Sequence, residues 1–237
     1  MLQSRWAAKV RARILETLFP SHCVGCAERG SWLCAACLSG LRQCGSGFCP
    51  GCLRPSTDGR PCLTCVAACP LTQLFAACPY RQNPLARAVE SLKYTGVQAL
   101  ADPLAELLIA HLEHFRYAGA WSKAFDAVIP VPLHRRRLLA RGYQQAALLA
   151  VPVAQHFSWP LREDVLFRVR ATRPQVGLPQ RTRLKNVRGA FSVSGMAPRR
   201  VLLVDDVVTT ASTMRACAQA LRDAGSHEVV ALALAHG

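Results

Sequence analysis

Two hydrophobic periodicities alternate along the chain from about residue 71 onward. Short continuous apolar runs have the length of buried strands, and between them apolar residues recur three or four positions apart, as on one face of a helix. Strands that alternate with helices predict an α/β domain with a parallel sheet. The expected strands are 74–80, 127–132, 201–204 and 228–235, and the expected helices are 85–92, 98–114, one that follows 132 and ends near 157, and 210–224.

Residues 20–70 show neither periodicity. They are rich in Gly and Pro and carry few large apolar side chains. A segment of about fifty residues with so thin a core needs cross-links, such as disulfides or a bound metal, to fold. The length of 237 residues fits a small module joined to a mid-sized domain. We therefore expect a short helix and a cysteine-rich ribbon module over 1–70, and the α/β domain over 71–237.

Cysteine pairs in this segment can provide the cross-links. Four C-x-x-C pairs fall within residues 23–65 of a chain that has 12 cysteines. Two such turns provide the four soft ligands of a tetrahedral Zn²⁺ site, so four pairs predict two closed, structural sites. A dithiol redox motif would instead open a helix of a βαβ unit, whereas these pairs lie among glycines and prolines. We expect sequential pairing, first with second and third with fourth, although the spacing also permits a crossed pairing. The expected ligands are Cys23, Cys26, Cys34, Cys37, Cys49, Cys52, Cys62 and Cys65.

The other thiols and two histidines lack such a pattern. Cys217 falls in the last predicted helix and is expected in the core. His111 and His114 are three residues apart on a predicted helix with no neighbouring ligand pattern, so we expect them on a solvated face. The spare thiols are Cys44, Cys69 and Cys78.

An acidic pair follows the apolar strand 201–204. Asp205 and Asp206 are succeeded by a turn rich in hydroxyls, and this turn opens the last helix. Helix N-terminal amides and hydroxyl groups suit a phosphate. Carboxylates beside such a phosphate site suit the hydroxyls of a ribose. The segment 201–213 therefore predicts binding of a ribose 5-phosphate group.

This segment resembles the signature of type I phosphoribosyltransferases, and the whole chain resembles the ComF family of competence-associated proteins. The family landmarks occur in order and span nearly the full length. After the cysteine pairs come Leu92-Lys93-Tyr94, Val131-Pro132-Leu133-His134-Arg135-Arg136-Arg137, Arg141-Gly142-Tyr143-Gln144-Gln145, Thr172-Arg173-Pro174-Gln175 with Gly177-Leu178, Asn186-Val187-Arg188-Gly189-Ala190-Phe191, and the acidic segment.

The resemblance implies a type I phosphoribosyltransferase-like parallel sheet with helices on both faces and an N-terminal double zinc ribbon. It implies 5-phospho-α-D-ribose 1-diphosphate (PRPP) with Mg²⁺ as ligand, and 168–190 as a flexible basic loop. The residues implied for PRPP are Asp205, Asp206, Val207, Val208, Thr209, Thr210, Ala211, Ser212 and Thr213. Those implied for the diphosphate and the basic turn are Leu133, His134, Arg135, Arg136 and Arg141.

Two positions depart from the family pattern. Ala211 stands where the family usually has glycine, and its methyl group crowds the phosphate or is harmless according to the sign of φ. Gln144 replaces an asparagine. No residue identifies an acceptor for the phosphoribosyl group. Two interpretations therefore weigh almost equally: binding without turnover, and transfer of the group as by a glycosyltransferase.

The formal charge of +15 is concentrated near the same site. Arginines cluster over 135–141, and 168–190 adds further cations without an acid. These basic segments suit PRPP or, as an alternative function, single-stranded DNA held through its phosphates. The family resemblance likewise implies DNA-uptake proteins as partners of a non-catalytic accessory protein.

The chain lacks the features of membrane or exported proteins. It has no run of about eighteen apolar residues, which argues against a membrane-spanning helix and membrane insertion. Residues 1–20 carry scattered basic residues and no uninterrupted apolar core of a signal peptide; their Arg-rich amphipathic pattern slightly resembles a transit peptide. A short surface helix is the simpler interpretation, and we expect a cytoplasmic protein.

Overall fold

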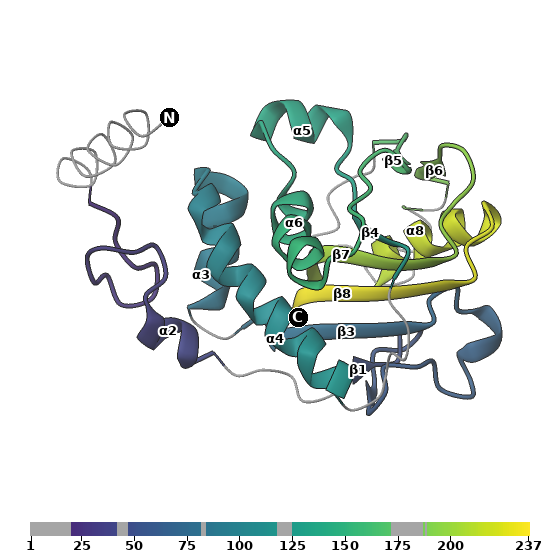
Figure 1. Cartoon of the computed structure of the whole chain (residues 1–237), viewed down its shortest axis with the longest axis horizontal. Coiled ribbons are helices and arrows are strands. Elements are labelled where there is room, and N and C mark those ends of the chain that lie inside the picture. The colour runs from purple at the N-terminus through teal and green to yellow at the C-terminus, as the bar shows by residue number, and fades with distance from the viewer. Residues whose placement is uncertain (1–19, 42–46, 82–83, 118–124, 172–186, 188) are drawn as a thin grey trace.

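A four-stranded parallel sheet forms the centre of the molecule (Figure 1). The computed structural model describes residues 20–41, 47–81, 84–117, 125–171, 187 and 189–237. The strand order is β3-β8-β7-β4, and all three neighbouring pairs are parallel. The strands are β3 (Gln73–Pro79), β4 (Ala127–Pro130), β7 (Arg200–Val208) and β8 (Glu228–His236).

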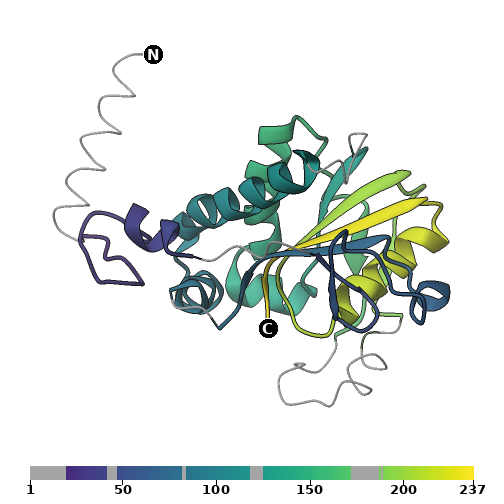
Figure 2. The same cartoon turned by 90° about the horizontal axis from the view of Figure 1, so that it is seen from below.

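Helices cover both faces of this sheet. Alternate strand residues point to opposite sides, so Leu202 and Leu203 contribute to two different apolar clusters. One cluster is closed by α3 (Leu85–Glu90), α4 (Ala101–Tyr117) and α6 (Gln145–Phe157). The other is closed by α8 (Ser212–Asp223), which lies across the sheet from α4 (Figure 2). The α/β class with a parallel sheet covered on both faces, expected from the sequence, is confirmed.

Two of the differences from the sequence-based expectation affect the site. The helix expected after β4 is in fact two helices, α5 (Arg135–Arg141) and α6, because Gly142 adopts a left-handed conformation with φ of 81°. Strand β7 runs four residues beyond the expected end at 204. The acidic pair therefore lies within the strand, where the backbone pairing of Asp205 with Ala233 of β8 holds it.

Short elements complete the chain. The antiparallel pair of β5 (Leu166–Arg168) and β6 (Phe191–Val193) contacts α8 through β6. Strands β1 (Gly47–Phe48) and β2 (Pro55–Ser56) pair antiparallel, and α2 (Ala35–Ser39) lies between the second and third cysteine pairs. Single turns of 3₁₀ helix span Val66–Ala68 and Gln98–Leu100, and a π-helical turn spans Ser91–Thr95.

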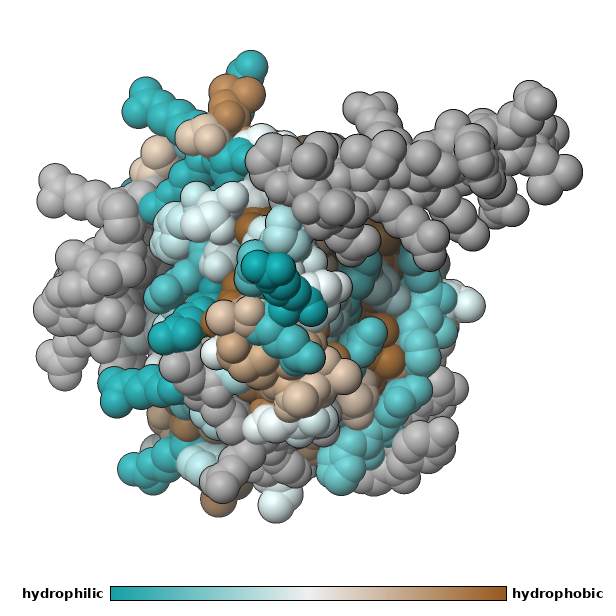
Figure 3. Space-filling view, turned by 90° about the vertical axis from the view of Figure 1, so that its left-hand side faces the viewer, coloured by the Kyte–Doolittle hydropathy of each residue, from teal (hydrophilic) through white to brown (hydrophobic). Residues whose placement is uncertain are grey.

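The N-terminal ribbons pack on the domain at two places. Gly25 lies so close to the start of α3 that an added Cβ would come within 2.7 Å of Pro84. The second ribbon lies along β3: the Leu74 amide donates to the Gly59 carbonyl at 3.0 Å, and Phe48 stacks on His236 at 4.3 Å. Figure 3 views the side of the first ribbon, where hydrophilic and pale residues mix and brown areas are small. None of the helices in the described ranges is long and apolar enough to cross a bilayer.

Candidate functional site

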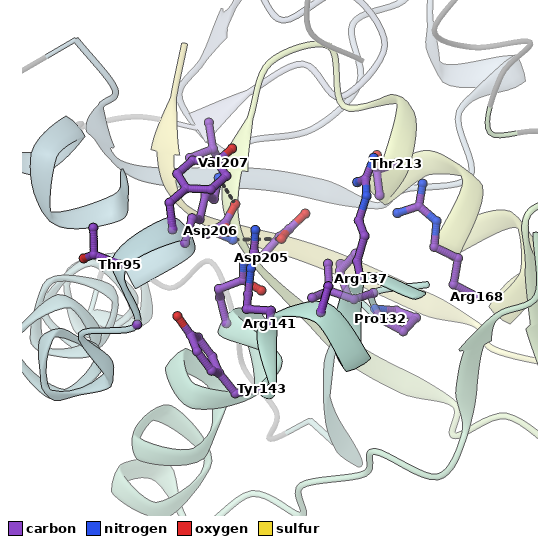
Figure 4. A pocket seen from close by; sticks show the side chains of 17 residues that line it. Thr95, Pro132, Arg137, Arg141, Tyr143, Arg168, Asp205, Asp206, Val207 and Thr213 are labelled. Atoms are coloured by element: carbon purple, nitrogen blue, oxygen red, sulfur yellow. Dashed lines mark hydrogen bonds and ion pairs between the residues drawn. The ribbon is translucent and has the colours of Figure 1, made fainter. Parts of the chain in front are cut away.

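A cavity of about 810 Å³ opens at the carboxyl ends of β4 and β7. In parallel α/β sheets this is the edge at which ligands bind. Its walls come from the π-helical turn, the segment after β4, the α5–α6 junction, β5 and the end of β7. Figure 4 shows the acidic pair in the middle, with Thr95 and Tyr143 on one side and Arg168 and Thr213 on the other.

The two carboxyl groups of the acidic pair lie in different electrostatic environments. Burial raises the pKa of Asp205 to about 7, and the neighbouring charge of Asp206 acts in the same direction. Asp206 is paired instead: its Oδ1 lies 2.9 Å from Nζ of Lys93. Burial lowers the pKa of Lys93, but the Asp206 carboxylate outweighs this effect and raises it overall. The pair thus combines one ion-paired carboxylate with one that readily holds a proton.

The hydroxyl-rich turn forms a small recess beside the pair. The recess measures about 40 Å³ and is lined by Asp205 and by residues 207–214. The Thr210 and Ser212 hydroxyls hydrogen-bond to each other at 2.8 Å at the start of α8. Together, the cavity and the recess contain all nine residues expected from the sequence to hold PRPP.

Ala211 occupies the one strained backbone position of this turn. Its φ of 54° lies in the left-handed region, which glycine adopts freely and which costs an L-residue about 1 kcal/mol. Its side chain is buried among apolar residues. The structure thus gives a conformational reason for glycine at this position, and it places the methyl group of Ala211 in the core.

The expected diphosphate residues divide into two groups. Leu133 and Arg141 line the cavity. His134 caps α5, its Nδ1 accepting the Arg136 amide at 3.3 Å. Arg135 and Arg136 are exposed on the same helix and are not among the lining residues. The turn itself is held by Gln144, whose Oε1 accepts the Leu133 amide at 3.1 Å.

The cavity lining also includes polar residues that were not among the expected site residues: Lys93, Arg137, Tyr143 and Arg168. Three of them belong to family landmarks, which was the available signal. Arg168 was expected in the basic loop but lies in β5, where burial and the nearby charge of Arg137 lower its pKa. The rest of that loop, over 172–186 and at 188, lies outside the described residues, as do residues 1–19 and Cys44.

The cysteine pairs form two separate clusters. In each, the four Sγ atoms lie within 4.8 Å of one another, and the grouping is the sequential one. The clusters repeat the same local geometry. The Cys34 amide donates to Cys23 Sγ and the Cys62 amide to Cys49 Sγ, both at 3.3 Å. In each cluster of four, the residue that follows the second cysteine has a positive φ. Four converging thiols fit a tetrahedral soft cation, so both clusters could hold zinc.

Comparisons with known proteins decide the family. No protein-family model matches the chain. The DNA utilization protein YhgH of Escherichia coli K12 is 32% identical over 205 residues, which are 84% of this chain and 88% of that protein. The chain belongs to the ComF family. Another relative is Competence protein F of Haemophilus influenzae, 28% identical over 220 residues, which are 85% of this chain and 96% of that protein.

A solved structure, that of Leishmania donovani UMP synthase, aligns with 61% of this ComF-family chain and 24% of its own chain. The TM-score is 0.33 and the sequence identity 18%, a likeness too slight to inform the substrate.

Proposed function

We propose that this ComF-family protein binds PRPP as its Mg²⁺ complex in the cavity at the end of β7. The observation that carries the proposal is the adjacency of two subsites. A carboxylate pair and a hydroxyl-lined recess at a helix N-terminus share Asp205 as a common wall. A ribose 5-phosphate presents a vicinal diol and a phosphate, and these match carboxylate acceptors and helix amides respectively.

The diphosphate of PRPP would lie toward the turn after β4. Arg141 and Arg137 line the cavity there, and guanidinium groups pair bidentately with phosphate oxygens. Mg²⁺ prefers oxygen ligands and keeps several waters, so phosphate oxygens of the substrate suit it. The Lys93 ammonium already neutralises one oxygen of Asp206, which favours a cation carried by the ligand over one held by the pair.

The same arrangement supports transfer of the phosphoribosyl group to an acceptor. When the bond between ribose C1′ and the diphosphate oxygen breaks, negative charge grows on the leaving diphosphate and positive charge on the ribose ring. Arginines near the diphosphate would stabilise the first charge, and the Asp205–Asp206 pair the second. No side chain in the described part of the cavity identifies the acceptor, so binding is the primary proposal.

Calorimetric titration with PRPP, with and without Mg²⁺, tests the proposal. We expect binding to the wild type that Mg²⁺ strengthens. Asp205→Asn/Asp206→Asn should weaken it by about 100-fold or more, because hydrogen bonds to charged groups contribute about 1.5–3 kcal/mol each. Asp164→Asn, which alters an exposed acid paired with Arg162, is the matched control and should bind as the wild type does. Absence of PRPP binding by the wild type would overturn the proposal.

A second candidate function is binding of single-stranded DNA as a non-catalytic step of DNA uptake. Two relatives are named for DNA utilization and competence. Helix α5 also exposes Arg135 and Arg136 beside the cavity, and Tyr94, 76% exposed, offers a ring for base stacking. Oligonucleotide binding that weakens steeply with salt and survives Asp205→Asn/Asp206→Asn would favour this function over PRPP binding.

We also propose that each cysteine cluster binds one structural Zn²⁺ and that the protein works in the cytoplasm. Closed four-thiolate sites supply folding energy and leave no position for a substrate. Thiols kept free for zinc require a reducing compartment, which is the basis for the cytoplasmic assignment.

A further inference from the structure

Lys93 places a positive charge inside the acidic subsite. Its side chain is 19% exposed and that of Asp206 12%, with 2.9 Å between Nζ and Oδ1. A lysine that served only to keep the protein soluble would extend into water. An exposed ion pair, in turn, contributes little to the stability of a fold. Burying this pair costs desolvation free energy, so its position calls for a function.

The backbone around Lys93 is braced against the opposite wall of the cavity. Lys93 belongs to the π-helical turn Ser91–Thr95, and such turns are frequent at functional sites. The Tyr143 hydroxyl donates a hydrogen bond to the Leu92 carbonyl. The Arg141 guanidinium lies over the Tyr94 ring, 5.6 Å from its centroid. These contacts tie both neighbours of Lys93 to the α5–α6 junction, which limits where its ammonium can reach.

One oxygen of each carboxylate is already engaged. Asp206 Oδ1 meets the lysine, and Asp205 Oδ1 accepts the Asp206 amide at 2.9 Å. The described residues provide no further hydrogen bond to either carboxylate, so Oδ2 of each is left for a ligand. Two acceptor oxygens on adjacent residues match the two O–H donors of a vicinal diol.

We propose that Lys93 is the positioning residue of the ribose subsite, orienting Asp206 toward the diol and cancelling one negative charge so that a sugar phosphate can approach. This inference rests on the proposed function. It assigns to Lys93 the orientation of Asp206 and the neutralisation of one carboxylate, and Mg²⁺ alone would not provide both. Without the lysine, two neighbouring carboxylates would repel each other and the incoming phosphate. With it, the pair can accept a diol from an anionic ligand before any divalent cation arrives.

The charges around the pair support this role. Lys93 from the π-helical turn and Arg168 from β5 are cations that favour the ionised form of Asp205. Tyr80, which follows β3, lies within the electrostatic influence of both Lys93 and Asp206, as well as of Glu90 on α3. Removal of the Lys93 charge should therefore raise the pKa of Asp205 further.

The test uses ribose 5-phosphate without a divalent cation, titrated calorimetrically between pH 6 and 9. Lys93→Met keeps the length of the side chain and removes the charge. We expect at least tenfold weaker binding and an upward shift of about one unit in the pH at which affinity changes. A merely structural role would weaken binding without moving that pH. Lys93→Arg should recover part of the affinity.

Arg87→Met is the matched control, since Arg87 is an exposed cation on the adjacent helix α3 and lies outside the cavity. It should bind within twofold of the wild type. If Lys93→Met fails to fold because Asp206 is left unpaired, Lys93→Met/Asp206→Asn, which removes both charges, should fold. A double variant that also fails to fold would contradict the ion pair.

The outcomes separate the two proposals. Lys93→Met that binds within twofold of the wild type, or binds weakly with an unchanged pH profile, overturns the role of Lys93 and leaves PRPP binding intact. A wild type that binds neither ribose 5-phosphate nor PRPP overturns the proposed function and the role of Lys93 in it.

Discussion

His111 shows how burial changes a single residue. Its side chain is only 1% exposed, packed between Phe75 and Phe115 with ring centroids 6.2 and 4.8 Å away. The solvated face expected for His111 is wrong, and only His114 is exposed. The Nε2 atom of His111 has no hydrogen-bond partner among the described residues. Burial lowers the pKa of His111 to about 4, and the charge of His114 contributes in the same direction.

This shift predicts acid sensitivity. The pKa of His111 is lower in the folded state than in the unfolded chain, where it is about 6.5. Its contribution to stability is therefore complete above pH 6.5 and is lost as the pH falls toward 4, by about 3 kcal/mol in all. His111→Phe should flatten the fall in the free energy of unfolding between pH 7 and 4.5, measured by urea denaturation. His114→Gln is the control, and equal slopes in wild type and His111→Phe would contradict the argument.

At the scale of elements, the break between α5 and α6 builds one wall of the cavity. Gly142 ends α5 in the left-handed region, and its amide donates to the Leu138 carbonyl at 2.8 Å. The chain then turns so that Tyr143 reaches Leu92 and Gln144 reaches Leu133. In an uninterrupted helix, the side chains of Tyr143 and Gln144 would point in other directions and would not reach Leu92 and Leu133.

Substitution of Gly142 should therefore have a cost set by the backbone. No atom lies within 4 Å of a Cβ added there, so steric overlap does not contribute. Gly142→Ala should lower the free energy of unfolding by about 1 kcal/mol, the cost of a left-handed L-residue. Gly142→Asn should cost less, because asparagine tolerates this conformation. Thermal unfolding of both variants measures their order of stability. A Gly142→Ala variant as stable as the wild type would contradict this expectation.

At the scale of the molecule, both cysteine clusters are joined to the α/β domain. Cys23, Leu33 and Leu41 belong to the same apolar cluster as α4 and α6. In the second ribbon, a Cβ added at Gly47 would lie 2.4 Å from Gly59 and 2.9 Å from the Leu74 carbonyl oxygen. This close approach fixes the ribbon against the edge strand β3. The ribbon thus covers an edge that would otherwise expose unpaired backbone groups.

Loss of the second metal should therefore weaken the whole domain. Cys49→Ser/Cys62→Ser should reduce bound zinc from two to one per chain and lower the melting temperature of the main transition, because structural zinc contributes on the order of 10 kcal/mol. Elemental analysis and calorimetry measure both quantities. Cys69→Ser, outside the cluster, should keep two zinc ions. A separate early transition with an unchanged main transition would show that the ribbon melts alone.

The sequence by itself determined the local features. Apolar periodicity located the four strands of the central sheet and most helices, since backbone geometry sets a repeat of 2 or 3.6 residues. The four C-x-x-C pairs indicated two metal sites, because the spacing alone aims two thiols together. The Asp205–Asp206 pair and its hydroxyl-rich turn were likewise readable, since they form one continuous segment.

The tertiary structure alone decided what meets across the sheet. The strand order β3-β8-β7-β4 brings the π-helical turn after α3 beside β7, and this places Lys93 against Asp206. It also turns His111 into the core, brings Arg168 to the cavity and groups the cysteines sequentially. Such contacts join residues far apart in the chain, where no local periodicity or spacing carries the information. They depend on packing the elements together, and that packing set the charge and shape of the site.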